Sequence, residues 1–234
     1  MAAMSDWRSF WDSNHSIYVN ARHKDVHYRE IAEGIATYVP GPNARVLDYG
    51  CGEALHADLV AAAAGEVYLS DSAATVRAQM AARFADNPRI KVLAPEKVEH
   101  LPSQTFDLIV SNSVVQYLTA AELDRLLALW RRLLKPDGAL IVADVIPPDV
   151  GTISDVTALL RYAARNRFLL AAVLGLARTA ISPYRKLRSQ LGIAQYTEAE
   201  FRQKLVAAGF SVERLSRNLE HNPARMSFRA KPML

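Results

Sequence analysis

The chain has 234 residues, of which 50% are hydrophobic and 22% are charged. This balance is typical of a folded globular protein, and the length allows one sizeable hydrophobic core. The single cysteine, Cys51, excludes an internal disulfide framework and a zinc site built from cysteines. The opening MAAMSDWRSF has no apolar stretch of a secretory signal, and the longest apolar run, Phe168 to Ala177, is shorter than the roughly 18–20 residues of a membrane span. We therefore expect a cytoplasmic protein.

The net charge of +4 comes from one segment of the chain. Seven of the 28 lysines and arginines lie between Val156 and Thr197, where no aspartate or glutamate occurs. The remainder is slightly acidic, with 21 basic against 24 acidic residues. Because the basicity is confined to one segment, it argues against a general nucleic-acid-binding surface.

The first half of the chain alternates helices with short apolar strands. Helices are predicted at residues 6–39, 54–64 and 73–84, and strands at 45–49, 67–69 and 90–93. The Pro40-Gly41-Pro42 breaker ends the first helix, and Gly65 is expected at the C′ position of the second. An irregular stretch containing Pro95 and Pro102 follows the third strand.

The second half begins with the same alternation of strands and helices, which a long helical stretch then interrupts. The predicted elements are a strand at 106–110, a helix at 119–134, a turn at 135–138, a strand at 139–143, a helix at 154–181 interrupted near Ser182-Pro183, a helix at 197–209 and strands at 211–215 and 226–230. Thr119 with Glu122, and Thr197 with Glu200, have the spacing of capping boxes. Gly209 is expected to end the last helix.

Strands separated by helices of this length predict an α/β fold with right-handed crossovers. We expect a doubly wound, mainly parallel seven-stranded sheet with helices on both faces and an added helical lid over the carboxyl ends of the strands. The predicted organisation is an N-terminal helical cap (1–40), a cofactor-binding core (41–151), a helical, basic and amphipathic insertion (152–196), and a last helix with two final strands (197–234).

A glycine turn follows the first strand, in the sequence Val46-Leu47-Asp48-Tyr49-Gly50-Cys51-Gly52-Glu53-Ala54. Glycines between a strand and a helix let a ligand approach the backbone closely. A dinucleotide fingerprint would need a third glycine at position 55, where this chain has Leu55. The carboxylate of Asp48, two residues before the first glycine, suits a cofactor with an ammonium group better than it suits a pyrophosphate.

The sequence resembles the class I S-adenosylmethionine-dependent methyltransferases of the small-molecule type. The resemblance covers residues 40–145 and rests on the D-x-G-C-G motif at 48–52, an acid after the second strand (Asp71), the fourth-strand FDLIVSN and the KPDG turn. It implies S-adenosylmethionine as cofactor, S-adenosylhomocysteine as product and no metal.

The same resemblance implies which residues hold this cofactor. Asp48 and the glycine turn would bind the methionine moiety, and Asp71 the ribose hydroxyls, although Asp71 also suits the N-cap of the next helix. The family's usual acid for adenine falls on Lys97, so the neighbouring Glu96 is the expected substitute. The full expected set is Asp48, Gly50, Cys51, Gly52, Asp71, Ser72, Glu96, Ser111 and Asn112.

The acceptor site is less clear from the sequence. Many small-molecule relatives have a histidine where this chain has Gln116 or Tyr117, so a histidine that acts as general base would have to come from elsewhere. The catalytic candidates are Tyr117 and the N-terminal histidines His15, His23 and His27. His23 and His27 share one helix face, but the pair has no third partner in the sequence, and no metal site is predicted. Acceptor contacts are expected from Tyr18, Gln116, Tyr117 and Tyr162, and His221 falls in a loop.

The segment 161–188 joins an apolar centre to basic ends. It could be a lid with solvated arginines, the lining of an apolar acceptor pocket, or a peripheral contact with an anionic membrane. We therefore expect a methyltransferase whose acceptor is small and hydrophobic, such as a quinone, an isoprenoid or a lipid. The alternatives are a nicotinamide-dependent oxidoreductase and a non-catalytic module that binds S-adenosylmethionine.

Overall fold

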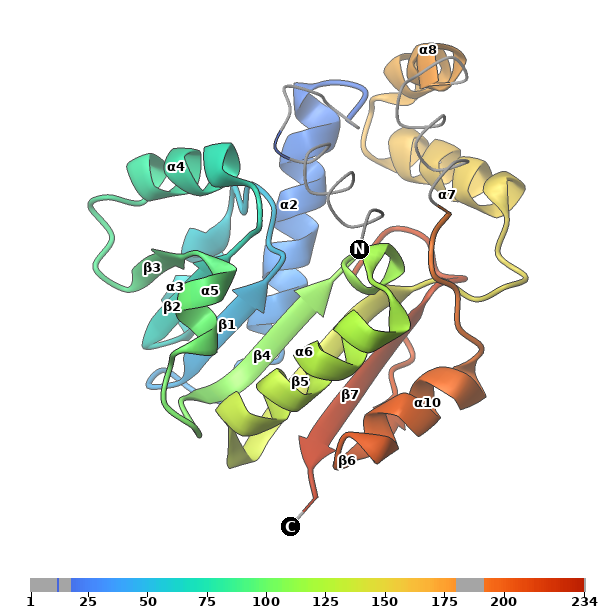
Figure 1. Ribbon diagram of the computed structural model, residues 1–234. Coiled ribbons are helices and arrows are strands. Elements are labelled where there is room, and N and C mark those ends of the chain that lie inside the picture. Colours follow the sequence, from blue (N-terminus) through green and yellow to red (C-terminus); the bar gives the residue numbers. More distant parts are fainter. Residues whose placement is uncertain (1–11, 13–17, 180–191, 234) are drawn as a thin grey trace.

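The computed structural model describes residue 12, residues 18–179 and residues 192–233 of the chain. Its centre is a seven-stranded sheet in the order β3-β2-β1-β4-β5-β7-β6 (Figure 1). The strands are β1 (Arg45–Tyr49), β2 (Glu66–Ser70), β3 (Ile90–Leu93), β4 (Phe106–Asn112), β5 (Leu134–Val145), β6 (Phe210–Arg214) and β7 (Met226–Pro232). Strands β1 to β5 pair in parallel, and β7 lies antiparallel to both β5 and β6. The predicted doubly wound, mainly parallel sheet is confirmed.

Helices cover both faces of this sheet because its strands are apolar on both sides. On β1, Val46 packs toward one face and Leu47 toward the other. The first face is covered by α2 (Ala21–Ala36), α3 (Ala57–Ala63) and α4 (Ala74–Arg83), and the second by α5 (Pro95–Glu99), α6 (Ala120–Leu133) and α10 (Glu198–Ala207). Each face thus has its own hydrophobic core.

Two further helices, α7 (Thr152–Arg165) and α8 (Leu169–Thr179), lie beyond the carboxyl ends of the strands (Figure 1). A small cluster around Tyr162 and Phe168 joins them to Val19, just before α2, and to Val26 within it. Within the described part of the chain, no helix is long and apolar enough to cross a membrane.

The predicted helix caps agree with the structure. Thr119 and Thr197 accept hydrogen bonds from the backbone N–H groups of Glu122 and Glu200, and both capping boxes are complete. Gly209 follows α10 with a φ of 85°, a conformation that favours glycine. These ends depend on local hydrogen bonds, which a short stretch of sequence determines.

Several predicted boundaries were wrong for local reasons. Asn20 caps α2 by accepting a hydrogen bond from the N–H of His23 (2.8 Å), so within the described residues the helix predicted at 6–39 begins only at Ala21. Gly65 is absent from the left-handed glycines, and a Cβ there would lie 3.1 Å from the backbone of Asn43, so this glycine serves a close chain approach rather than a C′ turn.

Later segments also differ from expectation. The helix predicted at 154–181 is divided into α7 and α8, because Arg167 adopts a φ of 61° between them. Residues 135–138 form an irregular part of β5, whose pairing with β4 passes from Leu134 to Ala139. The stretch predicted to be irregular contains α5. The predicted break near Ser182-Pro183 and the candidate His15 lie outside the described residues.

Candidate active site

A large cavity of about 1310 Å³ opens at the carboxyl ends of the parallel strands. Its walls come from the turn after β1, the end of β4, the inner face of α2, the start of α7 and the loop between β6 and β7. Ligand sites of open α/β sheets occur at this edge. The cavity has two ends, which we call the cofactor end (around Asp48, the glycine turn and Asp71) and the acceptor end (around His27, Asp144 and Glu220).

The glycine turn at the cofactor end has no room for side chains. Gly50 and Gly52 have φ values of 77° and 57°. A Cβ at Gly50 would lie 2.3 Å from Cγ2 of Val114, and one at Gly52 would lie 2.5 Å from the hydroxyl of Tyr28. The turn is therefore a backbone cradle, since any other residue would be both strained and crowded.

Asp71 ties the end of β2 to this cradle. One carboxylate oxygen accepts a hydrogen bond from the N–H of Gly52 (2.9 Å), and the other accepts one from the N–H of Ala73 (2.9 Å). The bond to Ala73 lies just before α4, so Asp71 supports the start of that helix while it lines the cavity. The two roles considered for this residue are therefore geometrically compatible.

Two buried carboxyl groups give the cofactor end its electrostatic character. Burial, together with the negative charge of Asp71, raises the pKa of Asp48 to about 7. Burial also raises the pKa of Asp71, against the opposing effect of its backbone hydrogen bonds. Because two adjacent carboxylates in a buried site repel each other, this end favours a ligand that carries positive charge.

Most of the expected cofactor residues line the cavity. Besides Asp48, Gly50, Gly52 and Asp71, the lining includes Cys51, Ser72, Glu96 and Asn112. Ser111 is fully buried in β4 and is not part of the lining, because successive residues of a strand point to opposite faces. The buried Oδ1 of Asn112 has no hydrogen-bond partner among the described residues, which leaves an acceptor free for a ligand.

The acceptor end contains most of the residues expected there. Tyr18, His23, His27, Gln116 and Tyr117 all line the cavity. Tyr162 is buried behind the wall, where its ring stacks on His221 with centroids 4.9 Å apart. Tyr162 therefore supports a lining residue rather than facing the cavity.

His23 and His27 have different surroundings despite their shared helix face. The ring of His23 stacks on Phe168 (4.8 Å), and its Nδ1 accepts a hydrogen bond from the N–H of Val19 (3.3 Å). Burial and the nearby His27 and His221 lower the pKa of His23 to about 4. His23 is thus a neutral residue of the packing between α2 and the α7–α8 pair.

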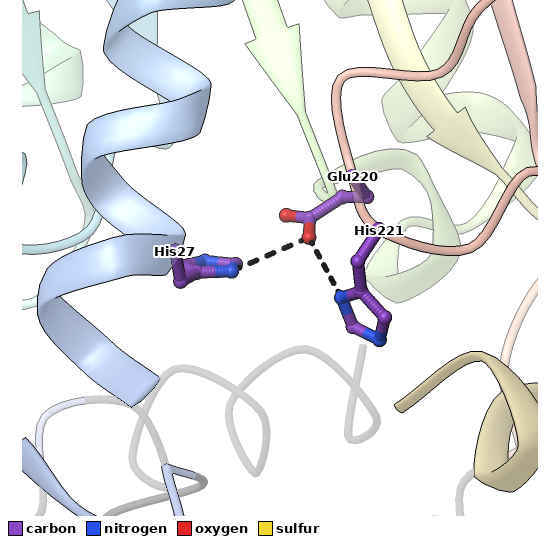
Figure 2. Close-up of side chains that lie close together, drawn as sticks. All are labelled: His27, Glu220 and His221. Atoms are coloured by element: carbon purple, nitrogen blue, oxygen red, sulfur yellow. Dashed lines mark ion pairs between the residues drawn. The ribbon is translucent and has the colours of Figure 1, made fainter. Parts of the chain in front are cut away.

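His27 instead meets the loop between β6 and β7. Its Nδ1 lies 3.4 Å from the carboxylate of Glu220, and the Nδ1 of His221 lies 3.7 Å from the same oxygen (Figure 2). Burial lowers the pKa of His27. Although burial alone would raise the pKa of Glu220, the two imidazoles and a hydrogen bond from Asn112 hold it well below its usual range.

A second polar group, built around Asp144 and Arg225, lies beside Glu220. The guanidinium of Arg225 donates to Asp144 (2.6 Å) and to Asp155 of α7 (2.9 Å). The hydroxyl of Ser113 is within hydrogen-bond distance of both Asp144 (2.7 Å) and Glu220 (3.3 Å). Burial raises the pKa of Asp144 to about 6 in spite of Arg225.

The backbone is strained at this point. Ser113, just after β4, and Asp144, near the end of β5, have φ values of 58° and 64°, in the left-handed region that non-glycine residues rarely adopt. Such conformations persist where the surrounding contacts require them, and they are frequent at functional sites. Here they accompany the contact of Ser113 with Glu220 and the contact of Asp144 with Arg225.

The sequence patterns did not predict the network around Glu220 and Asp144, because its residues are far apart in the chain. The 216–225 loop supplies Asn218, Glu220, His221, Asn222 and Arg225. The final hairpin could have indicated this loop. Because β7 runs antiparallel to β5, the loop that connects β6 to β7 must lie at the carboxyl edge of the parallel strands. His221 was predicted in a loop, without a role.

Comparisons with known proteins agree with this geometry. Residues 47–142 match the family described as a methyltransferase domain. The magnesium protoporphyrin IX methyltransferase of Synechocystis PCC 6803, solved with bound SAM, is similar with a TM-score of 0.61 and 16% identity, over 99% of this chain and 98% of that chain. No curated protein matches the chain at a significant level.

Two other solved structures are similar over shorter stretches. The YcgJ protein of Bacillus subtilis gives a TM-score of 0.57 at 16% identity, over 81% of this chain and 71% of that chain. The phosphoethanolamine N-methyltransferase 1 of Haemonchus contortus, in complex with phosphoethanolamine and S-adenosylhomocysteine, gives 0.53 at 22% identity, over 64% of this chain and 34% of that chain.

The fold is the class I, Rossmann-like fold of the methyltransferase structures that the chain resembles. Residues 47–142 match the methyltransferase domain family, and the chain shares its fold with a methyltransferase solved with bound SAM. The cavity fits this cofactor, because the backbone cradle admits close approach and the buried carboxylates suit a sulfonium and an ammonium group. These findings favour the methyltransferase over a nicotinamide-dependent oxidoreductase.

Proposed function

We propose that the chain transfers the methyl group of S-adenosylmethionine to a small acceptor with an apolar body and a polar, oxygen-bearing group. The observation that carries this proposal is the continuity of the two ends in one cavity of about 1310 Å³. Pockets for a single drug-sized ligand measure about 300–1,000 Å³. The larger volume gives room for a cofactor and a second molecule side by side.

The lining supports the predicted character of the acceptor. Apolar side chains, among them Ile146, Leu159 and Ile193, share the cavity with His27 and Glu220. A quinone-like, isoprenoid or lipid acceptor with an oxygen group would meet apolar walls along its body and the imidazole–carboxylate pair at its polar end. Acceptors that are polar throughout would leave the apolar walls unmatched.

The residues of the chain would act mainly by alignment. S-adenosylmethionine supplies an activated methyl group; Gly50 and Gly52 would admit its methionine part, Asp48 would pair with its ammonium group and Asp71 would accept bonds from its ribose. His27 and Glu220 would orient the polar group of the acceptor. Holding two reactants in line contributes up to about 7–11 kcal/mol to lowering a barrier, so positioning can supply much of the catalysis.

The test uses S-adenosylmethionine with a labelled methyl group. Purified protein is incubated with an extract of its source cells, and the products are separated into organic and aqueous phases. We expect label in the organic phase with the wild type and with Asp86→Asn, an exposed control, and a strong loss with Asp71→Asn. Label in the aqueous phase would contradict the apolar acceptor. Binding of S-adenosylmethionine without any transfer would favour the non-catalytic module.

We also propose that α8 contacts an anionic membrane from the cytoplasm. Leu170, Val173 and Leu174 are 76%, 51% and 53% exposed, and the nearby arginines at 161, 165 and 167 are exposed as well. An exposed apolar helix side beside basic residues is typical of peripheral membrane binding. Arg178 lies near the end of α8, and the basic residues of the predicted segment 161–188 from 180 onward lie outside the described residues.

Vesicle flotation tests this contact. The wild type should float with vesicles containing phosphatidylserine and much less with neutral vesicles, and Leu170→Ser with Leu174→Ser should remain in solution. Equal flotation of wild type and double variant would contradict the proposal.

A further inference from the structure

The cluster of His27, Glu220 and His221 has the composition and spacing of a metal site. One ligand atom of each residue lies within 4.8 Å of the others (Figure 2). The carboxylate oxygen that faces both rings is 3.4 Å from Nδ1 of His27 and 3.7 Å from Nδ1 of His221. Atoms that share a metal at about 2.0–2.2 Å lie about 3–4 Å apart, so small side-chain movements would bring the three atoms to one ion.

Residues outside the cluster hold each ligand in place. The second oxygen of Glu220 accepts a hydrogen bond from the side-chain amide of Asn112 (2.9 Å), so the first oxygen is turned toward the histidines. His221 is stacked on the buried ring of Tyr162, and the ring of His27 lies against Tyr18 (5.1 Å). Contacts of this kind orient the ligands of metal sites and maintain their affinity.

The charges around the cluster favour a cation. Three carboxylates, those of Asp144, Asp155 and Glu220, lie in this region. The guanidinium of Arg225 contacts the first two of them. Among the described residues, the ion pairs of Glu220 are with His27 and His221 alone. The Nδ1 of His221 is buried and makes no hydrogen bond within the described part of the chain. The three carboxylates outnumber the one guanidinium beside them, buried negative charge is costly unless it is balanced, and a bound cation would balance it.

We propose that His27, Glu220 and His221 bind one divalent transition-metal ion, such as Zn²⁺, with coordination positions left open to the cavity. Two imidazoles and one carboxylate suit zinc and neighbouring metals, and they match poorly with the all-oxygen shells of Mg²⁺ and Ca²⁺. Since the cluster lines the acceptor end, the open positions face the space for the methyl acceptor. The proposed site would give the protein a metal-binding function. This proposal does not depend on the proposed methyl transfer.

Direct metal binding tests the proposal. Protein without a polyhistidine tag is stripped with a chelator and titrated with Zn²⁺ by calorimetry, and with Co²⁺ by visible absorption, which reports nitrogen and oxygen ligation. We expect one ion per chain with a dissociation constant in the micromolar range or below. His27→Gln, Glu220→Gln and His221→Gln should each weaken binding at least tenfold.

A matched control and a second measurement keep the result clear. His100→Gln removes an exposed histidine outside the cavity and should leave metal affinity unchanged. Glu220→Gln keeps the shape of the side chain, and its thermal unfolding shows whether it folds. Binding that is equally tight in wild type and Glu220→Gln, or no binding to the wild type, would overturn the metal site. S-adenosylmethionine titrated into the same metal-free protein tests the cofactor end separately.

Discussion

The cofactor end and the acceptor end of the cavity are built in different ways. The cofactor end consists of two short stretches, the turn at 48–52 and the residues after β2. They are connected by hydrogen bonds that backbone N–H groups donate, such as that from Gly52 to the carboxylate of Asp71. The acceptor end brings together α2, the ends of β4 and β5, α7 and a loop near the C-terminus through side-chain contacts.

This difference explains why one end can be identified in a sequence and the other cannot. A turn that must approach a ligand through its backbone needs glycine at fixed positions, and such a requirement leaves a local motif. A network of side chains from distant segments leaves no spacing to detect. The two ends should therefore respond separately to mutation, and the following experiments test that separation.

The largest effect is expected when Arg225 is removed. Arg225→Met leaves the buried carboxylate of Asp144 without its cation, and breaking a buried pair in this way costs about 3–5 kcal/mol. Urea unfolding at pH 7.5 should show this loss, whereas Arg29→Met, in an exposed ion pair, should lose less than about 1 kcal/mol. If the folded variant lost its affinity for S-adenosylmethionine as well, the two ends would not be independent.

A large effect of pH is expected at the cofactor end. The folded pKa of Asp48 is about 7, above the value of about 3.9 in an unfolded chain. Between these values the folded state holds more protons, so the ligand-free protein loses stability as pH rises, by about 2–4 kcal/mol. Asp48→Asn should remove this decline, as followed by urea unfolding from pH 4.5 to 7.5. Parallel curves for wild type and variant would show that Asp48 ionises normally.

A moderate effect is expected from Asp71. Asp71→Asn removes the charge that would accept the ribose hydroxyls, and affinity for S-adenosylmethionine should fall about 10–100-fold, or about 1–3 kcal/mol. Calorimetry measures the change, and Asp86→Asn, an exposed aspartate, serves as the control. Unchanged affinity would leave Asp71 with only its role before α4.

The smallest effect is expected from His23. Its folded pKa of about 4 lies below the value of about 6.5 in an unfolded chain. The unfolded state therefore binds more protons between these values, and the protein loses stability as pH falls. His23→Phe keeps the stacking on Phe168 and should change stability at pH 7.5 by less than about 1 kcal/mol. The wild type should lose about 2 kcal/mol between pH 7.5 and pH 5. At pH 5 the variant should therefore be the more stable of the two by about 1–2 kcal/mol, and the reverse order would contradict the burial argument.

Much of the fold was predictable because it depends on short-range patterns. The capping boxes at Thr119 and Thr197, and the left-handed Gly209 after α10, were correctly predicted. The prediction failed where a tertiary contact determined the backbone, as at Gly65, which lies against Asn43. It also failed at Ser111, where a shift of one residue along β4 decides which side chain faces the cavity.

The sequence by itself determined the alternation of strands and helices, the glycine turn with Asp48, and the acid at Asp71, because each is a requirement on neighbouring residues. Only the tertiary structure decided that His27 meets Glu220 and His221, since these residues are separated by most of the chain. Their contact depends on the antiparallel β7, which returns the 216–225 loop to the carboxyl edge beside α2. Chain topology, rather than residue spacing, thus placed the acceptor end.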